Sequence, residues 1–197
     1  SASHQAAAKF LDAVARLPGC DGEDSDAEGA YTQVMLTDEL FRKMGEEPVD
    51  TWISLPYDRW PESWKKRKDL VDPVVKLLRN LYGHPLAGLY WEKHCQASIF
   101  DAGFEKINGW ECLYVNREKG LFLSVYVDDF KLAGKKENLA PMWAELRKTL
   151  ALEPFTKQKF DPPKQLIEDK SLLFTRLLGT TGKAGSKQHS DTESTRY

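Results

Sequence analysis

The sequence has no apolar run long enough to cross a membrane. A transmembrane helix needs about 20 consecutive apolar residues, and the 41% of hydrophobic residues here is interrupted throughout by polar ones. The N-terminal residues also lack the basic region followed by an apolar region that marks a signal peptide. These absences predict a protein without a membrane span and without a secretory leader.

Cysteine is scarce, and its spacing is uninformative for metal binding. Cys20, Cys95 and Cys112 are odd in number and far apart in the sequence. They therefore provide neither a disulfide framework nor the close spacing of a zinc site. Because unpaired cysteines are typical of intracellular proteins, we expect an intracellular, reducing compartment, whose identity stays open.

An excess of positive charge is also missing. The chain has 28 Lys and Arg against 30 Asp and Glu, which gives a net charge of −2. Domains that bind nucleic acid on their own are usually basic, so this balance argues against strong autonomous binding to nucleic acid. The length of 197 residues is sufficient for one domain with a hydrophobic core.

The most informative local pattern lies at residues 121–134. Residues 121–127 are almost all apolar or β-branched, which predicts a buried strand. Asp128 and Asp129 interrupt the pattern, and apolar residues resume at Phe130 and end at Gly134. Two carboxylates between two short strands predict the tip of a β-hairpin, and on their own they indicate nothing more than a polar turn.

A catalytic role for these two acids would require a third acid from another strand. Two-metal nucleotidyl transfer depends on clustered carboxylates that hold two divalent cations. Asp26, which follows the acidic segment 21–25, is one candidate. Asp24 lies two residues earlier and competes for the same role. The acidic segment 21–25 itself predicts a turn.

The remaining periodicities predict an α+β domain. They indicate helices at 3–17, 87–100 and 139–150, a short helix or loop at 37–50, and strands at 51–55 and 104–107. A polar turn at 116–120 divides 111–127 into an antiparallel pair of strands. We expect Thr37 and Asn138 to cap helices, and Trp91, Trp143 and Leu146 to lie in the core. The expected architecture has two layers, an antiparallel sheet with helices packed on one face.

The chain divides into three parts by composition. Residues 1–152 form the predicted domain, and 153–179 form an irregular connecting segment interrupted by prolines. Residues 180–197 are rich in Gly, Ser, Thr and Lys, which predicts a disordered tail.

Three motifs together resemble a known family. Tyr126-Val127-Asp128-Asp129 resembles the Tyr-x-Asp-Asp box of reverse transcriptases, and the upstream Asp26 with its trailing aromatic residue resembles the end of their first palm strand. The third motif resembles the copia-type pattern and comprises Leu81, Tyr82, Gly83, Ala87 and Trp91. Over residues 3–150 the chain resembles the palm region of copia-type reverse transcriptases of LTR retrotransposons.

The resemblance implies a palm-like fold and an RNA-directed DNA polymerase activity, a nucleotidyltransferase reaction. It implies that Asp26, Asp128 and Asp129 are catalytic and ligate Mg²⁺ or Mn²⁺. It also implies that Tyr31 and Tyr126 contact the nucleotide, and that the partners are an RNA or DNA template-primer and a dNTP. We accordingly expect Asp26 and Asp128 to lie opposite each other on adjacent strands.

The chain also departs from the family. The family usually has a Gln beside the nucleotide pocket where this chain has Leu86. The basic fingers segment would precede Ser1, and no convincing thumb follows the palm-like region. These differences predict that the isolated chain is inactive. They leave open an alternative, a non-catalytic descendant of the palm that serves as a structural or interaction subunit with protein partners.

Overall fold

The computed structural model describes residues 2–45 and 47–157. The helices are α1 (Ala2–Ala15), α2 (Asp38–Met44), α3 (Glu62–Lys65), α4 (Ala87–Asp101) and α5 (Lys136–Leu146), with 3-10 turns η1 (Ala30–Gln33) and η2 (Tyr57–Arg59). The strands are β1 (Cys20–Asp26), β2 (Trp52–Ser54), β3 (Val74–Lys76), β4 (Glu105–Lys106), β5 (Leu113–Asn116), β6 (Leu121–Tyr126), β7 (Asp129–Lys135) and β8 (Thr156–Lys157). The predicted tail at 180–197, and the part of the predicted connecting segment beyond residue 157, lie outside the described residues.

The central feature is a six-stranded sheet with the order β4-β5-β6-β7-β1-β8. Every neighbouring pair of strands in this sheet is antiparallel. Strands β4 to β7 follow one another along the chain, whereas β1 comes from the N-terminal part and inserts beside β7. The fold class is therefore α+β with an antiparallel sheet, as the sequence predicts.

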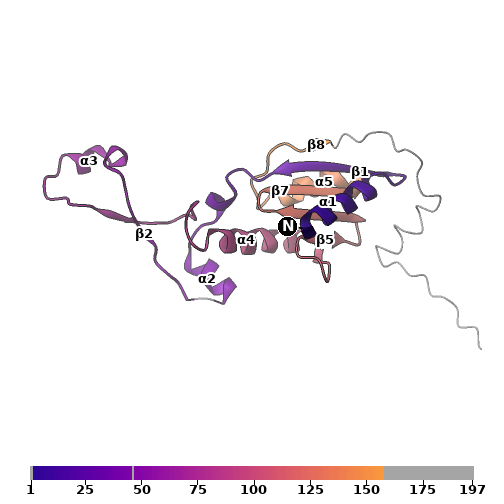
Figure 1. Ribbon diagram of the computed structural model, residues 1–197, viewed down its shortest axis with the longest axis horizontal. Helices are drawn as coiled ribbons and strands as arrows, with labels where there is room; N and C mark the ends of the chain where they lie inside the picture. The colour runs from indigo at the N-terminus through magenta and orange to yellow at the C-terminus, as the bar shows by residue number, and fades with distance from the viewer. Residues whose placement is uncertain (1, 46, 158–197) are drawn as a thin grey trace, which may run out of the picture.

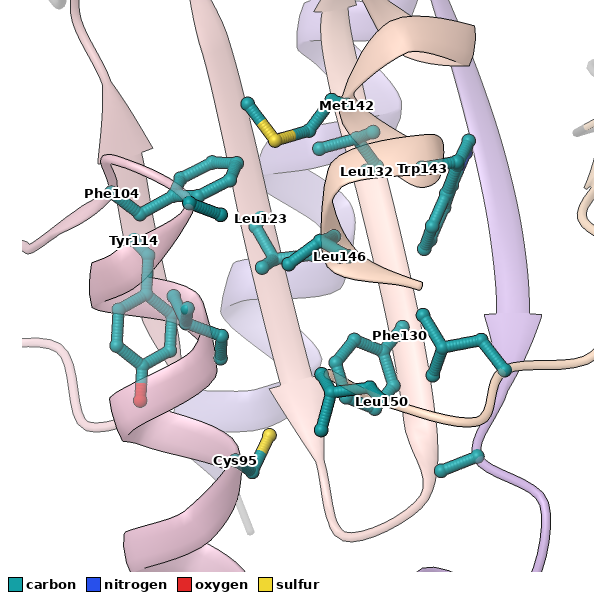
Figure 2. Packing of buried hydrophobic residues seen from close by; sticks show 14 of the residues in the cluster. Cys95, Phe104, Tyr114, Leu123, Phe130, Leu132, Met142, Trp143, Leu146 and Leu150 are labelled. Atoms are coloured by element: carbon teal, nitrogen blue, oxygen red, sulfur yellow. The ribbon is translucent and has the colours of Figure 1, made fainter. Parts of the chain in front are cut away.

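Helices α4 and α5 cover one face of the sheet and form the larger core (Figure 2). Because side chains alternate along a strand, Leu123, Phe130 and Leu132 all point to this face. Trp143 and Leu146 of α5 pack against them and are fully buried. Trp91 of α4 is only 3% exposed, so the predicted core position of these two tryptophans and Leu146 is confirmed.

Helix α1 covers the opposite face of the sheet. Leu11 and Val14 of this helix pack against Val115, Phe122 and Ala133, which alternate with the residues of the larger core. The expectation of two layers with helices on one face is therefore wrong, and the domain has three layers. Because β5, β6 and β7 carry apolar residues that point to both faces, each face must be shielded from water.

The acidic segment 21–25, for which a turn was predicted, is part of β1 and lies between β7 and β8. Its polar side chains find partners inside the fold. The indole Nε1 of Trp143 donates to Glu23 Oε2 at 2.9 Å, and Ser25 Oγ donates to the Glu153 carbonyl at 2.7 Å. The hydrogen bonds of two neighbouring strands thus override the low strand propensity of acidic residues.

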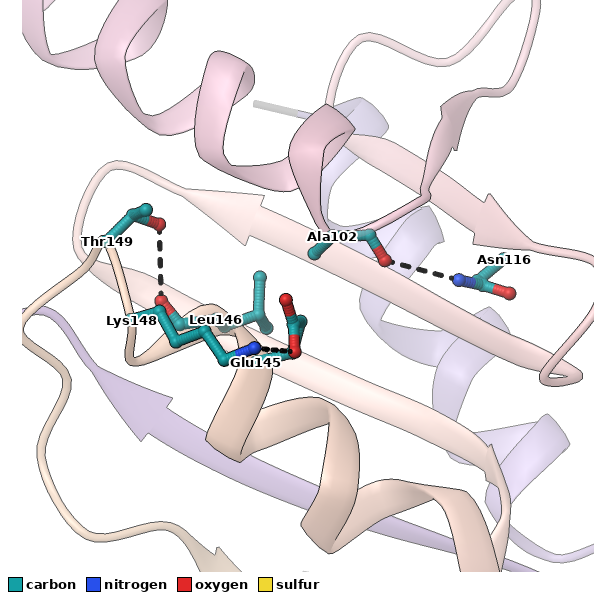
Figure 3. A network of polar contacts seen from close by, with 6 residues as sticks. All are labelled: Ala102, Asn116, Glu145, Leu146, Lys148 and Thr149. Carbon is teal, nitrogen blue, oxygen red and sulfur yellow. Dashed lines mark hydrogen bonds and ion pairs between the residues drawn. The ribbon is translucent and has the colours of Figure 1, made fainter.

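Polar side chains tie the helices to the strand connections. Asn138 does not cap α5, which begins earlier, at Lys136. Its Nδ2 instead donates to the Lys119 carbonyl in the β5–β6 turn at 2.7 Å. Asn116 Nδ2 donates to the Ala102 carbonyl after α4 at 3.4 Å (Figure 3). The predicted cap of α2 is confirmed, since the Thr37 side chain accepts from the backbone of that helix.

Strands β2 and β3 form a separate two-stranded ribbon that belongs to an arm, residues 51–79. Figure 1 shows β2 and α3 projecting well beyond the central sheet. The indole of Trp60 donates to the Leu55 carbonyl at 2.7 Å and packs against Tyr57 and Trp64. Within residues 2–45 and 47–157, no helix has the length and apolar character needed to span a bilayer.

Candidate functional site

The hairpin of β6 and β7 closes through a strained two-residue turn. Tyr126 and Asp129 form the last pair of the ladder, so Val127 and Asp128 occupy the two central positions. Val127 has a φ of 58°, in the left-handed region. A positive φ at only the first central residue is typical of a type II′ turn, where glycine is preferred. A β-branched residue there is an outlier, and surrounding contacts must maintain it.

Two contacts from distant segments hold this turn. The indole Nε1 of Trp91, on α4, donates to the Val127 carbonyl at 2.6 Å. The backbone N–H of Ala27, directly after β1, donates to the Asp128 carbonyl at 2.8 Å. The sequence identifies Trp91 as a core residue but not as the donor that fixes the turn. The available signal was that a buried indole N–H needs an acceptor.

The structure brings Asp26 and Asp129 together. They are direct partners in the β1–β7 ladder, and both are exposed. Directly opposite residues of an antiparallel pair share a face, with Cβ atoms about 4.5–5.5 Å apart, and like charges in this arrangement repel. The register thus differs by one residue from the expectation, which paired Asp26 with Asp128. The reason is that Asp128 is used in the turn and not in the strand.

Asp24, the competing acid, lies in a different environment. It is half-buried on β1 and pairs in register with Lys131 of β7. The Nζ of Lys131 also forms an ion pair with Asp12 of α1 at 2.6 Å. A cation therefore already lies opposite Asp24, whereas a carboxylate lies opposite Asp26, which makes Asp26 the better candidate for a metal ligand.

The predicted three-acid set is assembled only in part. In the portion of the chain that the structure describes, no group of three His, Cys, Asp or Glu residues is close enough to hold a metal ion. Asp26 and Asp129 share a register position, while Asp128 is presented separately at the turn. Asp128 is exposed, as the other two are.

The two predicted nucleotide-contacting residues meet at one cavity. Tyr31, on η1, and Tyr126, at the end of β6, both line a cavity of about 330 Å³ together with Trp91. The ring of Tyr31 also lies 4.6 Å, centroid to centroid, from that of Tyr82. Leu86, for which the resemblance predicts a Gln, is the N-cap residue of α4 and is 41% exposed.

The buried titratable groups near α4 do not add nucleophiles to the site. Burial raises the pKa of the Cys95 thiol to about 12, so this thiol is protonated at neutral pH. Burial also lowers the pKa of the His94 imidazole, which favours its neutral form. The three cysteines are all free thiols. Because the thiolate is the reactive form of cysteine, Cys95 is a structural residue.

No protein-family model matches the chain, and no curated protein or solved structure matches it either. The functional argument therefore depends on the residues and geometry of the hairpin and of β1.

Proposed function

We propose that the chain is the palm module of a copia-type RNA-directed DNA polymerase, in which Asp26, Asp128 and Asp129 serve two-metal nucleotidyl transfer. The observation that carries the proposal is the pairing of Asp26 with Asp129 beside the turn that presents Asp128. The strand order β6-β7-β1 supports it, because this order places the acid from the distant strand next to the hairpin.

The chemistry of the acids fits a divalent cation. Two carboxylates held opposite each other repel, and a cation relieves that repulsion. Mg²⁺ prefers oxygen ligands and usually takes only one or two protein carboxylates, with substrate phosphates and water completing its coordination. Asp26 and Asp129 supply such a pair. A bound cation would stabilise charge on the transferring phosphoryl group.

We further propose that the isolated chain does not extend a primer. Phosphoryl transfer depends largely on holding the triphosphate and the attacking hydroxyl in line. Leu86 cannot donate a hydrogen bond from its side chain as the family's Gln does, and the net charge of −2 gives little attraction for a polyanion.

A second candidate is a non-catalytic palm-like subunit of a larger assembly. The observation that favours it is that Asp26, Asp128 and Asp129 do not form a three-ligand group in the described residues. In that case the acids would be remnants of an ancestral site, and the domain would act through its surfaces on protein partners.

Mn²⁺ binding followed by NMR distinguishes the two candidates. Bound Mn²⁺ should broaden the amide signals of β1 and the 127–128 turn, and Asp26→Asn should abolish this broadening. Glu118→Gln, which removes an exposed acid elsewhere, serves as the matched control. Broadening that is absent, or unaffected by Asp26→Asn, would exclude the metal site and favour the non-catalytic subunit.

A primer-extension assay with Mg²⁺ or Mn²⁺ tests the second part of the proposal, with Asp128→Asn as its control. We expect no extension by either protein. Extension by the wild type that Asp128→Asn abolishes would show that the isolated chain is an active polymerase.

A further inference from the structure

The cavity beside the hairpin has the size of a small-ligand site. It lies where α4 faces β5 and β6, reaches the Val127 turn, and has a volume of about 330 Å³. Sites for small molecules typically have volumes of about 300–1,000 Å³ and combine apolar walls with a few polar groups.

The walls of this cavity are aromatic and its charged groups are all acidic. Tyr31, Trp91, Tyr114 and Tyr126 contribute four aromatic side chains, and Glu92 and Glu111 are the two charged side chains among its lining residues. No Lys, Arg or His of the described chain is among those residues. A cationic head group inside the cavity would therefore meet opposite charge, whereas an anionic group would meet carboxylates and no compensating basic side chain.

Two of the four aromatic side chains, Trp91 and Tyr114, are held in place before any ligand enters. Trp91 is buried, and its indole N–H is fixed by the 2.6 Å hydrogen bond to the Val127 carbonyl. Tyr114 is 5% exposed. Burial raises the pKa of its phenol, and the negative charge of Glu92 adds to this effect. The phenol is therefore neutral at physiological pH.

We propose that this cavity binds a compact organic cation with a methylated ammonium head. Aromatic faces attract such cations, and recognition of quaternary ammonium groups by clustered aromatic side chains is a recurrent use of this interaction. Glu92 and Glu111, exposed on α4 and before β5, provide the complementary charge. The inference goes beyond nucleotidyl transfer and does not depend on Asp26, Asp128 or Asp129.

Two sources can supply this head group, a free small molecule or a trimethyllysine side chain of a protein. Calorimetry without divalent cations compares choline with its neutral isostere, in which carbon replaces the ammonium nitrogen. We expect choline to bind about tenfold more tightly than the isostere, since cation–π attraction contributes of this order at a partly desolvated site. A trimethyllysine peptide is then compared with choline, and its unmodified counterpart serves as the control. Tighter binding of choline indicates a free small molecule as the source, and tighter binding of the modified peptide indicates a protein side chain.

Variants test whether binding occurs at this cavity. The double variant Glu92→Gln with Glu111→Gln should weaken choline binding about tenfold and leave the neutral isostere unaffected. Glu118→Gln should change neither affinity, because Glu118 lies outside the cavity. Both glutamates are exposed, so the variants should melt at the temperature of the wild type, which circular dichroism checks.

Three results would overturn the proposal. The first is that choline and the neutral isostere bind with equal affinity. The second is that the double glutamate variant binds choline as tightly as the wild type does. The third is that, in the Glu118→Gln protein, a nucleoside triphosphate displaces bound choline as readily as free choline does. None of these results bears on the Mn²⁺ experiment, so failure here is distinguishable from failure of the polymerase proposal.

Discussion

Replacing Asp26 with Asn should stabilise the metal-free protein. Asp26 and Asp129 are direct partners in the β1–β7 ladder and both are exposed. Two unit charges about 5 Å apart repel by about 0.8 kcal/mol in water. The amide removes one charge but keeps the size and shape of the side chain. The free energy of unfolding should therefore rise by roughly 0.5–1 kcal/mol.

The same repulsion predicts opposite responses to salt and to divalent cations. Because both acids are exposed, raising the ionic strength should shrink the difference between wild type and Asp26→Asn. Mg²⁺ or Mn²⁺ should stabilise the wild type by binding the native state, and should stabilise the variant much less. With the divalent cation present, the wild type should thus be more stable than Asp26→Asn.

Urea denaturation followed by circular dichroism measures these free energies at low salt, at high salt and with added Mg²⁺. Glu118→Gln, another exposed acid, is the matched control and should respond to Mg²⁺ as the wild type does. The reasoning is refuted if Asp26→Asn is no more stable than the wild type at low salt, or if Mg²⁺ stabilises both proteins equally.

Three further variants test the structure around the site. Trp91→Ala should lower the free energy of unfolding by about 3–5 kcal/mol, because it empties a core position and orphans the Val127 carbonyl; a loss well under 1 kcal/mol in urea denaturation would contradict the core assignment. Gly134→Ala should cost about 3 kcal/mol in the same assay, because Gly134 has a φ of 144° and a methyl group there would collide with the Gly120 carbonyl; an unchanged midpoint would exclude this close approach. Burial raises the pKa of Glu23 above its ordinary value of 4.5, and the hydrogen bond from Trp143 opposes this only in part. The native state therefore holds the Glu23 proton more tightly than the unfolded state does. As a consequence, the free energy of unfolding falls as the pH rises from about 4.5. Glu23→Gln should remove this fall, and stability curves of both proteins measured across acidic to neutral pH check it; parallel curves would refute it.

The sequence predicts the β6–β7 hairpin and helix α4 well, because their signals are local. The apolar run to Tyr126, the two acids and the closing Gly134 indicate two strands and a tip, and α4 ends at Asp101, close to the position that Gly103 indicates. The register of the tip could not be predicted in the same way. A two-residue turn can centre on 127–128 or on 128–129, and the pairing of Tyr126 with Asp129 in the structure selects the first.

Other features depend on contacts between distant segments. The acidic segment of β1 has little strand propensity, and its pairing with both β7 and β8 decides its conformation. The sequence does contain a local indication that the second face of the sheet is covered. Phe122 is apolar and points to the α1 face, while the leucines on either side of it point to the face covered by α4 and α5. An uninterrupted apolar strand indicates burial on both faces, but it does not say which helix provides the cover.

The conformation of the turn at Val127 and Asp128 depends on segments that are distant in the sequence. Its carbonyls are bound by Trp91, 36 residues before Val127, and by Ala27, which follows the first strand. Neither contact can form from the hairpin alone, so the left-handed conformation of Val127 should be lost whenever β1 or α4 detaches. The Ala27 amide proton should accordingly exchange with solvent only when β1 separates from β7. Its protection would follow the integrity of the site in real time, without a substrate or a bound metal.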